Sequence, residues 1–124
     1  MEFNNRQSIY LQIAEMICER ILLKHFKVDE RIPSVREMAV QLEVNPNTVM
    51  RTYEFLQSKE IISNKRGVGY FVSTDGLAKA TDFRKAEFLE QELPKIFKTA
   101  QLLKISFDEL KDRYTALDNK TPKA

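Results

Sequence analysis

The sequence feature that most constrains the fold is a pair of short amphipathic segments, about residues 35–42 and 46–56, separated by a tight turn. The S-x-x-E spacing that begins at Ser34 is typical of a capping box, so it predicts a helix that starts there. Asn45 is a strong N-cap residue, and Pro46 suits the first position of a helix, where its missing N–H costs nothing. Apolar residues at i, i+3, i+4 and i+7 give each helix one face to bury. These faces consist of Val35, Met38, Ala39 and Leu42 in the first helix and of Val49, Thr52, Tyr53 and Leu56 in the second.

A short β-hairpin is predicted directly after the second helix. Residues 61–63 and 70–72 are rich in β-forming residues, and the basic sequence KRGVG at 65–69 joins them. Its two glycines allow positive φ at a tight tip, and its two cations place positive charge beside them. Two capped helices followed by this hairpin predict a mainly α fold with a small β-hairpin wing, that is, a winged helix-turn-helix.

Three motifs resemble the GntR family of bacterial transcription regulators. The longest is IPSVREMAVQLEVNPNTV at 32–49, which resembles the family's L-P-S-x-R-x-L-A-x-x-L-x-V-x-x-x-T-V. The others are RGVGYFV at 66–72 and SIYLQI at 8–13, which resemble R-x-G-x-G-x-F-V and P-I-Y-x-Q-I. The sequence NPNTVMRTYE and the short helical tail are similar to the YtrA-type subfamily. This resemblance implies a homodimeric repressor that binds an inverted-repeat operator in double-stranded DNA without a cofactor, and it leaves any small-molecule effector unknown.

The resemblance also implies which residues contact DNA. They lie at the starts of the two helices and at the hairpin tip: Ser34, Arg36, Asn45, Asn47, Thr48, Arg51, Lys65, Arg66, Gly67 and Gly69. Arg51 is expected to read guanine in a bidentate manner, and the cations of the tip are expected to contact phosphates. Pro46 and Met50 stand where many family members have arginine, so the operator sequence stays open.

Each of these assignments has a structural alternative. For Arg36 the alternative is a helix residue that contacts only solvent. Asn47 and Thr48 are also residue types that cap helices. The two cations of the hairpin also suit a solvated loop. Net charge does not decide between them, because residues 1–76 hold ten Lys and Arg against ten Asp and Glu. The DNA-binding prediction therefore rests on where the cations are placed.

The sequence disfavours an enzyme. The single His25 and single Cys18 lie on or just after the first helix, with no nucleophile–base pair and no metal-ligand spacing. No apolar run approaches 18 residues and no secretory signal is present, so we expect a soluble, cytoplasmic protein without a membrane partner. The remaining alternative is a winged helix that binds a protein instead of DNA, with Phe55 as an exposed contact.

Residues 77–124 are predicted to form a helical dimerisation segment, which follows a winged domain of residues 1–76. Apolar residues from Ala86 onwards are spaced 3, 4, 3, 4, 3, like a coiled-coil seam, and Pro94 inside this seam predicts a kink. Segments below about 40 residues usually need a partner to be stable, which favours a second copy over a tail that folds back on its own winged domain. The predicted dimer contacts are Phe83, Ala86, Leu89, Leu93, Ile96, Phe97, Ala100, Leu103, Leu110 and Tyr114.

Overall fold

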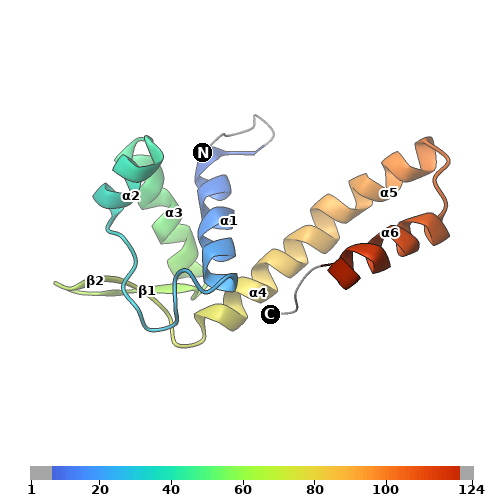
Figure 1. Ribbon diagram of the computed structural model, residues 1–124. Coiled ribbons are helices and arrows are strands. Elements are labelled where there is room, and N and C mark those ends of the chain that lie inside the picture. The colour runs from blue at the N-terminus through green and yellow to red at the C-terminus, as the bar shows by residue number, and fades with distance from the viewer. Residues whose placement is uncertain (1–6, 121–124) are drawn as a thin grey trace. The chain divides into compact units, whose positions relative to one another are not determined.

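The computed structural model describes residues 7–120, and the chain divides into two compact units between Lys85 and Ala86. We call the part up to Lys85 the N-terminal unit and the part from Ala86 the tail unit. The mainly α fold with a two-stranded antiparallel hairpin is confirmed (Figure 1). The elements are α1 (Ile9–Leu22), α2 (Val35–Leu42), α3 (Pro46–Ser58), β1 (Ile62–Lys65), β2 (Gly69–Val72), α4 (Gly76–Glu87), the π-helical turn η1 (Phe88–Glu92), α5 (Leu93–Leu102) and α6 (Phe107–Lys120).

The core of the N-terminal unit lies where α1, α2 and α3 meet. α3 packs against α1 on one side and against α2 on the other (Figure 1). The predicted apolar faces of α2 and α3 are buried in this core, except that Val35 is half-buried. Burial of one large apolar side chain contributes about 1.5–3 kcal/mol. The packing therefore fixes which face of α3 remains in solvent.

Side-chain caps fix the starts of α2 and α3, as predicted. The Glu37 N–H donates to the Ser34 hydroxyl oxygen at 3.1 Å, and the Ser34 N–H donates to the Glu37 carboxylate at 3.0 Å. The hydrogen bond from the Ser34 backbone is the main reason that the pKa of Glu37 lies below its ordinary value. The N–H of Asn47 donates to the Asn45 side-chain oxygen at 2.8 Å, and Pro46 is the first residue of α3.

A buried tyrosine joins α3 to its neighbours. The Tyr53 hydroxyl donates to the Pro33 carbonyl oxygen at 2.6 Å, in the loop before α2. Its ring meets that of Tyr70, in β2, edge to face, with centroids 4.8 Å apart. Burial raises the pKa of Tyr53, so the hydroxyl keeps its proton and remains a donor. One side chain of α3 thus contacts both the entry to α2 and the wing.

The wing is a hairpin whose base is fastened to the loop before α2. Lys65 lies opposite Gly69 in the antiparallel register, and Gly67 at the tip has a φ of +78°. A residue with a Cβ adopts this conformation at a cost, so the tip favours glycine. The N–H of Ile32 donates to the Tyr70 carbonyl oxygen at 2.9 Å, which adds a short extended segment along β2.

The N-terminal unit extends further along the chain than the predicted boundary at Gly76. Gly76 is buried, and a Cβ at this position would lie 2.6 Å from the Ile61 carbonyl oxygen. This glycine therefore allows α4 to approach the residue that precedes the wing closely. Ala80 is fully buried and Phe83 packs against the core, so the compact part continues to Lys85.

Two phenylalanines have different surroundings from those predicted. The Phe55 ring meets the Phe83 ring edge to face with centroids 5.5 Å apart, and it meets the Tyr10 ring at 6.1 Å. Phe55 is half-buried as a result. Phe83 therefore belongs to the core of its own chain instead of the seam, and Phe55 is not an exposed contact. The prediction placed Phe83 in the seam, because the spacing of apolar residues does not show which face of α4 packs against the core.

The tail unit contains a π-helical turn that interrupts the predicted seam. In η1 the N–H of Leu93 donates to the Phe88 carbonyl oxygen, five residues back, directly before Pro94. A π-helical turn holds about one residue more than an α-helical turn. The 3, 4 spacing therefore does not keep one register from Ala86 to Leu103, and this corrects the prediction of a continuous seam.

Most apolar side chains of the tail unit remain exposed. Ala100 is the only buried residue of this unit within the described part of the chain. Among the other predicted dimer contacts in this unit, Leu93 and Leu110 are half-buried, and Ala86, Leu89, Ile96, Phe97, Leu103 and Tyr114 are exposed.

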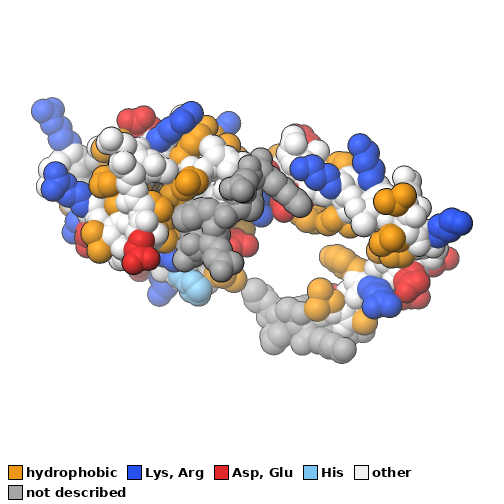
Figure 2. Space-filling view, turned by 90° about the horizontal axis from the view of Figure 1, so that it is seen from above, with side chains coloured by type: hydrophobic (Ala, Val, Ile, Leu, Met, Phe, Trp, Pro, Cys, Tyr) orange, Lys and Arg blue, Asp and Glu red, His pale blue; other side chains and the backbone are white. Residues whose placement is uncertain are grey.

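An open apolar groove lies between α5 and α6. It has a volume of about 320 Å³. Figure 2 shows hydrophobic side chains along the sides of α5 and α6 that face each other. The tail unit thus exposes an apolar surface that its own residues do not cover. The groove is lined by Phe97, Ala100, Gln101, Ile105, Phe107 and Leu110.

Candidate nucleic-acid interface

The exposed start of α3 presents polar side chains that no other described residue uses. Asn45 performs the capping, through the bond from the Asn47 N–H. The side chains of Asn47 and Thr48 make no hydrogen bond with any residue in 7–120. Asn47 is exposed and Thr48 is half-buried. The alternative in which these two side chains act only as caps is therefore wrong, and the Asn47 amide keeps both donor and acceptor available.

The start of α2 carries a cation that pairs with no other described residue. Arg36 is exposed and forms no ion pair or hydrogen bond with the residues that the structure describes. Ser34 uses its hydroxyl oxygen in the cap of α2, so its hydroxyl proton is the part that is available to a phosphate. A helix N-terminus with a cation in its first turn favours an anion.

Arg51 lies against α1 and does not extend freely from α3. Its guanidinium carbon is 4.0 Å from the centre of the Tyr10 ring. Tyr10 is held beside α3, because its carbonyl oxygen accepts from the Thr52 hydroxyl at 2.8 Å. A cation–π contact at an exposed site contributes about 0.5–1 kcal/mol. This arrangement differs from the extended guanine reader that we expected, and the preceding residue, Met50, is 40% exposed.

The wing and its base carry three cations. Arg66 is exposed at the tip and has no ion pair among the described residues. The Lys65 ammonium nitrogen lies 4.3 Å from the centre of the Phe71 ring. Arg31, which no sequence motif identified, forms a β-bridge with Phe71, and its Nε would lie 2.9 Å from a Cβ at Gly69. The glycine at 69 therefore makes room for Arg31.

The groups of the candidate interface lie on α2, on α3, which packs against α1, and on the wing. In Figure 1, α2 and the tip of the wing lie on the far side of α3 from α1. Figure 2 shows Lys and Arg side chains around the outer edge of this unit, interspersed with Asp and Glu. Any attraction of this surface for phosphates would therefore come from where the cations are placed, and not from net charge.

Comparison with known proteins decides the family. Residues 9–72 match the family profile described as "Bacterial regulatory proteins, gntR family". This match begins at the first residue of α1 and ends at the last residue of β2, so it covers the helix-turn-helix and the wing. The chain belongs to the GntR family. The resemblance of the three motifs is thereby confirmed.

Individual relatives agree with the GntR assignment. The chain is 35% identical over 109 residues to an uncharacterized HTH-type transcriptional regulator, YhcF, of Bacillus subtilis (strain 168), and the match covers 88% of each protein. It is 32% identical over 103 residues to the HTH-type transcriptional repressor YtrA of the same organism, covering 82% of this chain and 78% of YtrA. The crystal structure of a GntR-family transcriptional regulator from Bacteroides thetaiotaomicron superposes with a TM-score of 0.72 at 45% identity, covering 91% of this chain and 98% of that one.

Membership of the GntR family settles the question of catalysis. The family and the relatives are transcriptional regulators, so this chain is not an enzyme.

Within residues 7–120, no helix has the length and apolar character that crossing a membrane requires. In the same residues, no group of three or more His, Cys, Asp or Glu side chains is arranged to hold a metal ion.

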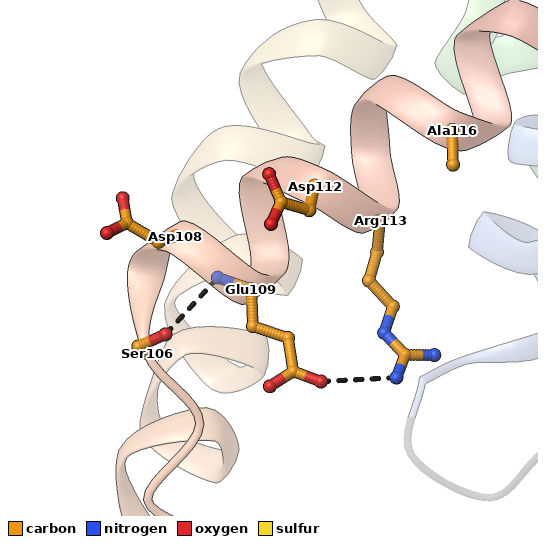
Figure 3. A pocket seen from close by; sticks show the side chains of 6 residues that line it. All are labelled: Ser106, Asp108, Glu109, Asp112, Arg113 and Ala116. Atoms are coloured by element: carbon orange, nitrogen blue, oxygen red, sulfur yellow. Dashed lines mark hydrogen bonds and ion pairs between the residues drawn. The ribbon is translucent and has the colours of Figure 1, made fainter.

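An open hollow at the start of α6 does not have the charge of a nucleic-acid site. Figure 3 shows the Glu109 N–H donating to the Ser106 hydroxyl at 3.2 Å, and Arg113 pairing with the Glu109 carboxylate at 3.1 Å. Asp108 and Asp112 also line the hollow, so its carboxylates outnumber its single cation. A surface of this charge repels phosphates.

Proposed function

We propose that this GntR-family protein is a cytoplasmic transcriptional repressor that binds an inverted-repeat operator in double-stranded DNA as a homodimer, without a cofactor. The observation that carries the proposal is a set of polar and cationic side chains that have no partner among residues 7–120. They lie at the starts of α2 and α3 and at the wing tip: Arg36, Asn47, Thr48 and Arg66. In a helix-turn-helix the second helix enters the major groove, and these residue types contact phosphates and base edges.

The exposed apolar surface of the tail unit supports the homodimer. Leu89, Ile96 and Phe97 are 43–48% exposed, and a unit of this size gains stability from a partner. A second copy offers the same apolar surface, so a two-fold pairing covers both. The same symmetry would place two recognition helices on two half-sites, which is the reason to expect an inverted repeat. A tail that folds back on its own winged domain would instead give a monomer in sedimentation.

The sign of regulation rests on similarity to YtrA, which is named a repressor. The rival function, a winged helix that binds a protein instead of DNA, depended on an exposed Phe55. That ring is half-buried between Tyr10 and Phe83, so the rival loses the surface feature that motivated it.

DNA binding by the full chain is expected to weaken steeply as salt is added. Each protomer carries Arg36, Arg51, Lys65 and Arg66 on or beside the proposed interface. If a dimer neutralises about six to eight phosphates, log K should fall with log salt at a slope of roughly −5 to −7, because bound cations release counterions from DNA. Fluorescence anisotropy of a labelled duplex at several salt concentrations measures this slope. A slope near zero would remove the DNA-binding function.

A further inference from the structure

We infer that Met50 and Asn47 read an A·T step in each operator half-site, Met50 through the 5-methyl group of thymine and Asn47 through N6 and N7 of adenine. The inference rests on the proposed function and deepens it, because it names the bases that this interface recognises.

Met50 is an apolar side chain on the surface that would enter the DNA groove. It is 40% exposed, whereas Val49, Tyr53 and Leu56 of the same helix are fully buried. The fold therefore gains less from an apolar residue at this position than at the buried ones. In the major groove, the apolar group that base pairs present is the methyl group of thymine. A methionine here matches that group and cannot bind a phosphate.

Asn47 lies one helical turn before Met50, so the two side chains leave α3 on neighbouring positions of one face. The Asn47 side chain makes no hydrogen bond with residues 7–120, while the cap from Asn45 already satisfies its backbone N–H. A free amide offers one donor and one acceptor in the geometry that matches N7 and N6–H of adenine. Adenine and thymine occur in the same base pair, so both side chains are satisfied by one A·T-containing step.

Arg51, the only cation in α3, does not occupy this position. Its guanidinium is stacked on the Tyr10 ring, and the Thr52 hydroxyl fixes Tyr10 beside α3. The residue type that reads guanine best is therefore directed towards α1. What remains exposed at the start of the helix is the Asn47 amide and the Met50 thioether, with the half-buried Thr48 hydroxyl between them in the chain.

The test uses the operator duplex that the full chain selects from random-sequence DNA, modified one group at a time. Deoxyuridine in place of thymine removes only the 5-methyl group, and 7-deazaadenine in place of adenine removes only the N7 acceptor. At one thymine per half-site we expect deoxyuridine to lower affinity about threefold to fivefold, which corresponds to one lost apolar carbon contact. At one adenine we expect 7-deazaadenine to lower it about threefold to tenfold, which corresponds to one lost hydrogen bond.

Variants then assign each effect to a residue, as in a double-mutant cycle. Met50→Ala should bind the thymine and deoxyuridine duplexes equally, and Asn47→Ala should bind the adenine and 7-deazaadenine duplexes equally. Arg51→Ala should leave the preferred bases unchanged. Leu23→Ala is the matched control, because it shortens a 64% exposed apolar side chain at the end of α1 and should retain full sensitivity to deoxyuridine.

Sequence-specific binding in which no thymine responds to deoxyuridine, or in which Met50→Ala still responds, would overturn this inference and leave the proposed function standing. A guanine preference that disappears in Arg51→Ala would do the same. If the chain selects no DNA at all, the proposed function and this inference both fail.

Discussion

Replacing both Arg36 and Arg66 by alanine is expected to lower the affinity for operator DNA about 10²–10³-fold. Both side chains are exposed, and no residue in the described part of the chain pairs with their charge. The double variant removes four phosphate contacts from a dimer, each worth about 1 kcal/mol. The salt slope should become shallower by about 3–4, because fewer counterions are released. Anisotropy titrations of wild type and variant at matched salt measure both changes.

The control for this experiment removes the same charge elsewhere in the N-terminal unit. Lys24 and Lys27 are exposed residues after α1, and Lys24→Ala with Lys27→Ala should bind DNA nearly as wild type does. Thermal unfolding should be similar for all three proteins. An equal loss of affinity in the control would mean that total charge, and not the α2 and wing positions, determines binding.

Phe97→Glu is expected to produce monomers and to reduce operator affinity about 10²–10⁴-fold, the advantage that linking two half-site modules can provide. Phe97 is 43% exposed and lines the apolar groove between α5 and α6. A carboxylate there would be desolvated in the dimer without a partner, which is costly. Sedimentation velocity reports the oligomeric state, and titration with a full operator and with a single half-site reports the avidity. Affinity for the half-site should be unchanged.

Thr99→Glu provides the matched control for the tail. Thr99 is an exposed residue of α5, two positions after Phe97 and therefore about 200° around the helix from it. The substitution Thr99→Glu thus adds the same charge on a different face. This variant should remain dimeric. If Phe97→Glu also remains dimeric and binds the full operator like wild type, the dimer interface lies elsewhere on the chain.

The local parts of this structure could be predicted because short-range rules determine them. The cap at Ser34, the cap at Asn45 and the buried stripes of α2 and α3 each depend on residues within two turns of one another. The hairpin follows from β-forming runs on either side of a glycine-containing tip. These same residues carry the family motifs, so fold and family were predicted together.

The contacts that correct the site involve residues far apart in the chain. Arg51 is held by Tyr10, and the space for Arg31 depends on Gly69, so neither arrangement is visible in local spacing. Gly76 was predicted as the end of the winged domain, but it lies in close contact with the Ile61 carbonyl. In each case tertiary packing decides what a residue does, and a motif reports only its type.

The register of the tail could not be predicted for a different reason. The apolar spacing across Pro94 is consistent with an unbroken α-helix, and only the bond from Leu93 to Phe88 reveals the wider turn. A π-helical turn changes which residues share a face without changing the sequence pattern. Phe97 and Leu110, which were both predicted as dimer contacts, line one groove.

Selection of DNA by the full chain from a random-sequence pool, followed by sequencing, tests the central claim most directly. We predict enriched sequences that contain two inverted half-sites, with centres separated by about 10 base pairs or a multiple of that distance. Enrichment should be lost with Arg36→Ala and Arg66→Ala combined. A selected pool that shows no enrichment over the starting DNA would contradict the claim that α2, α3 and the wing form a sequence-specific DNA interface.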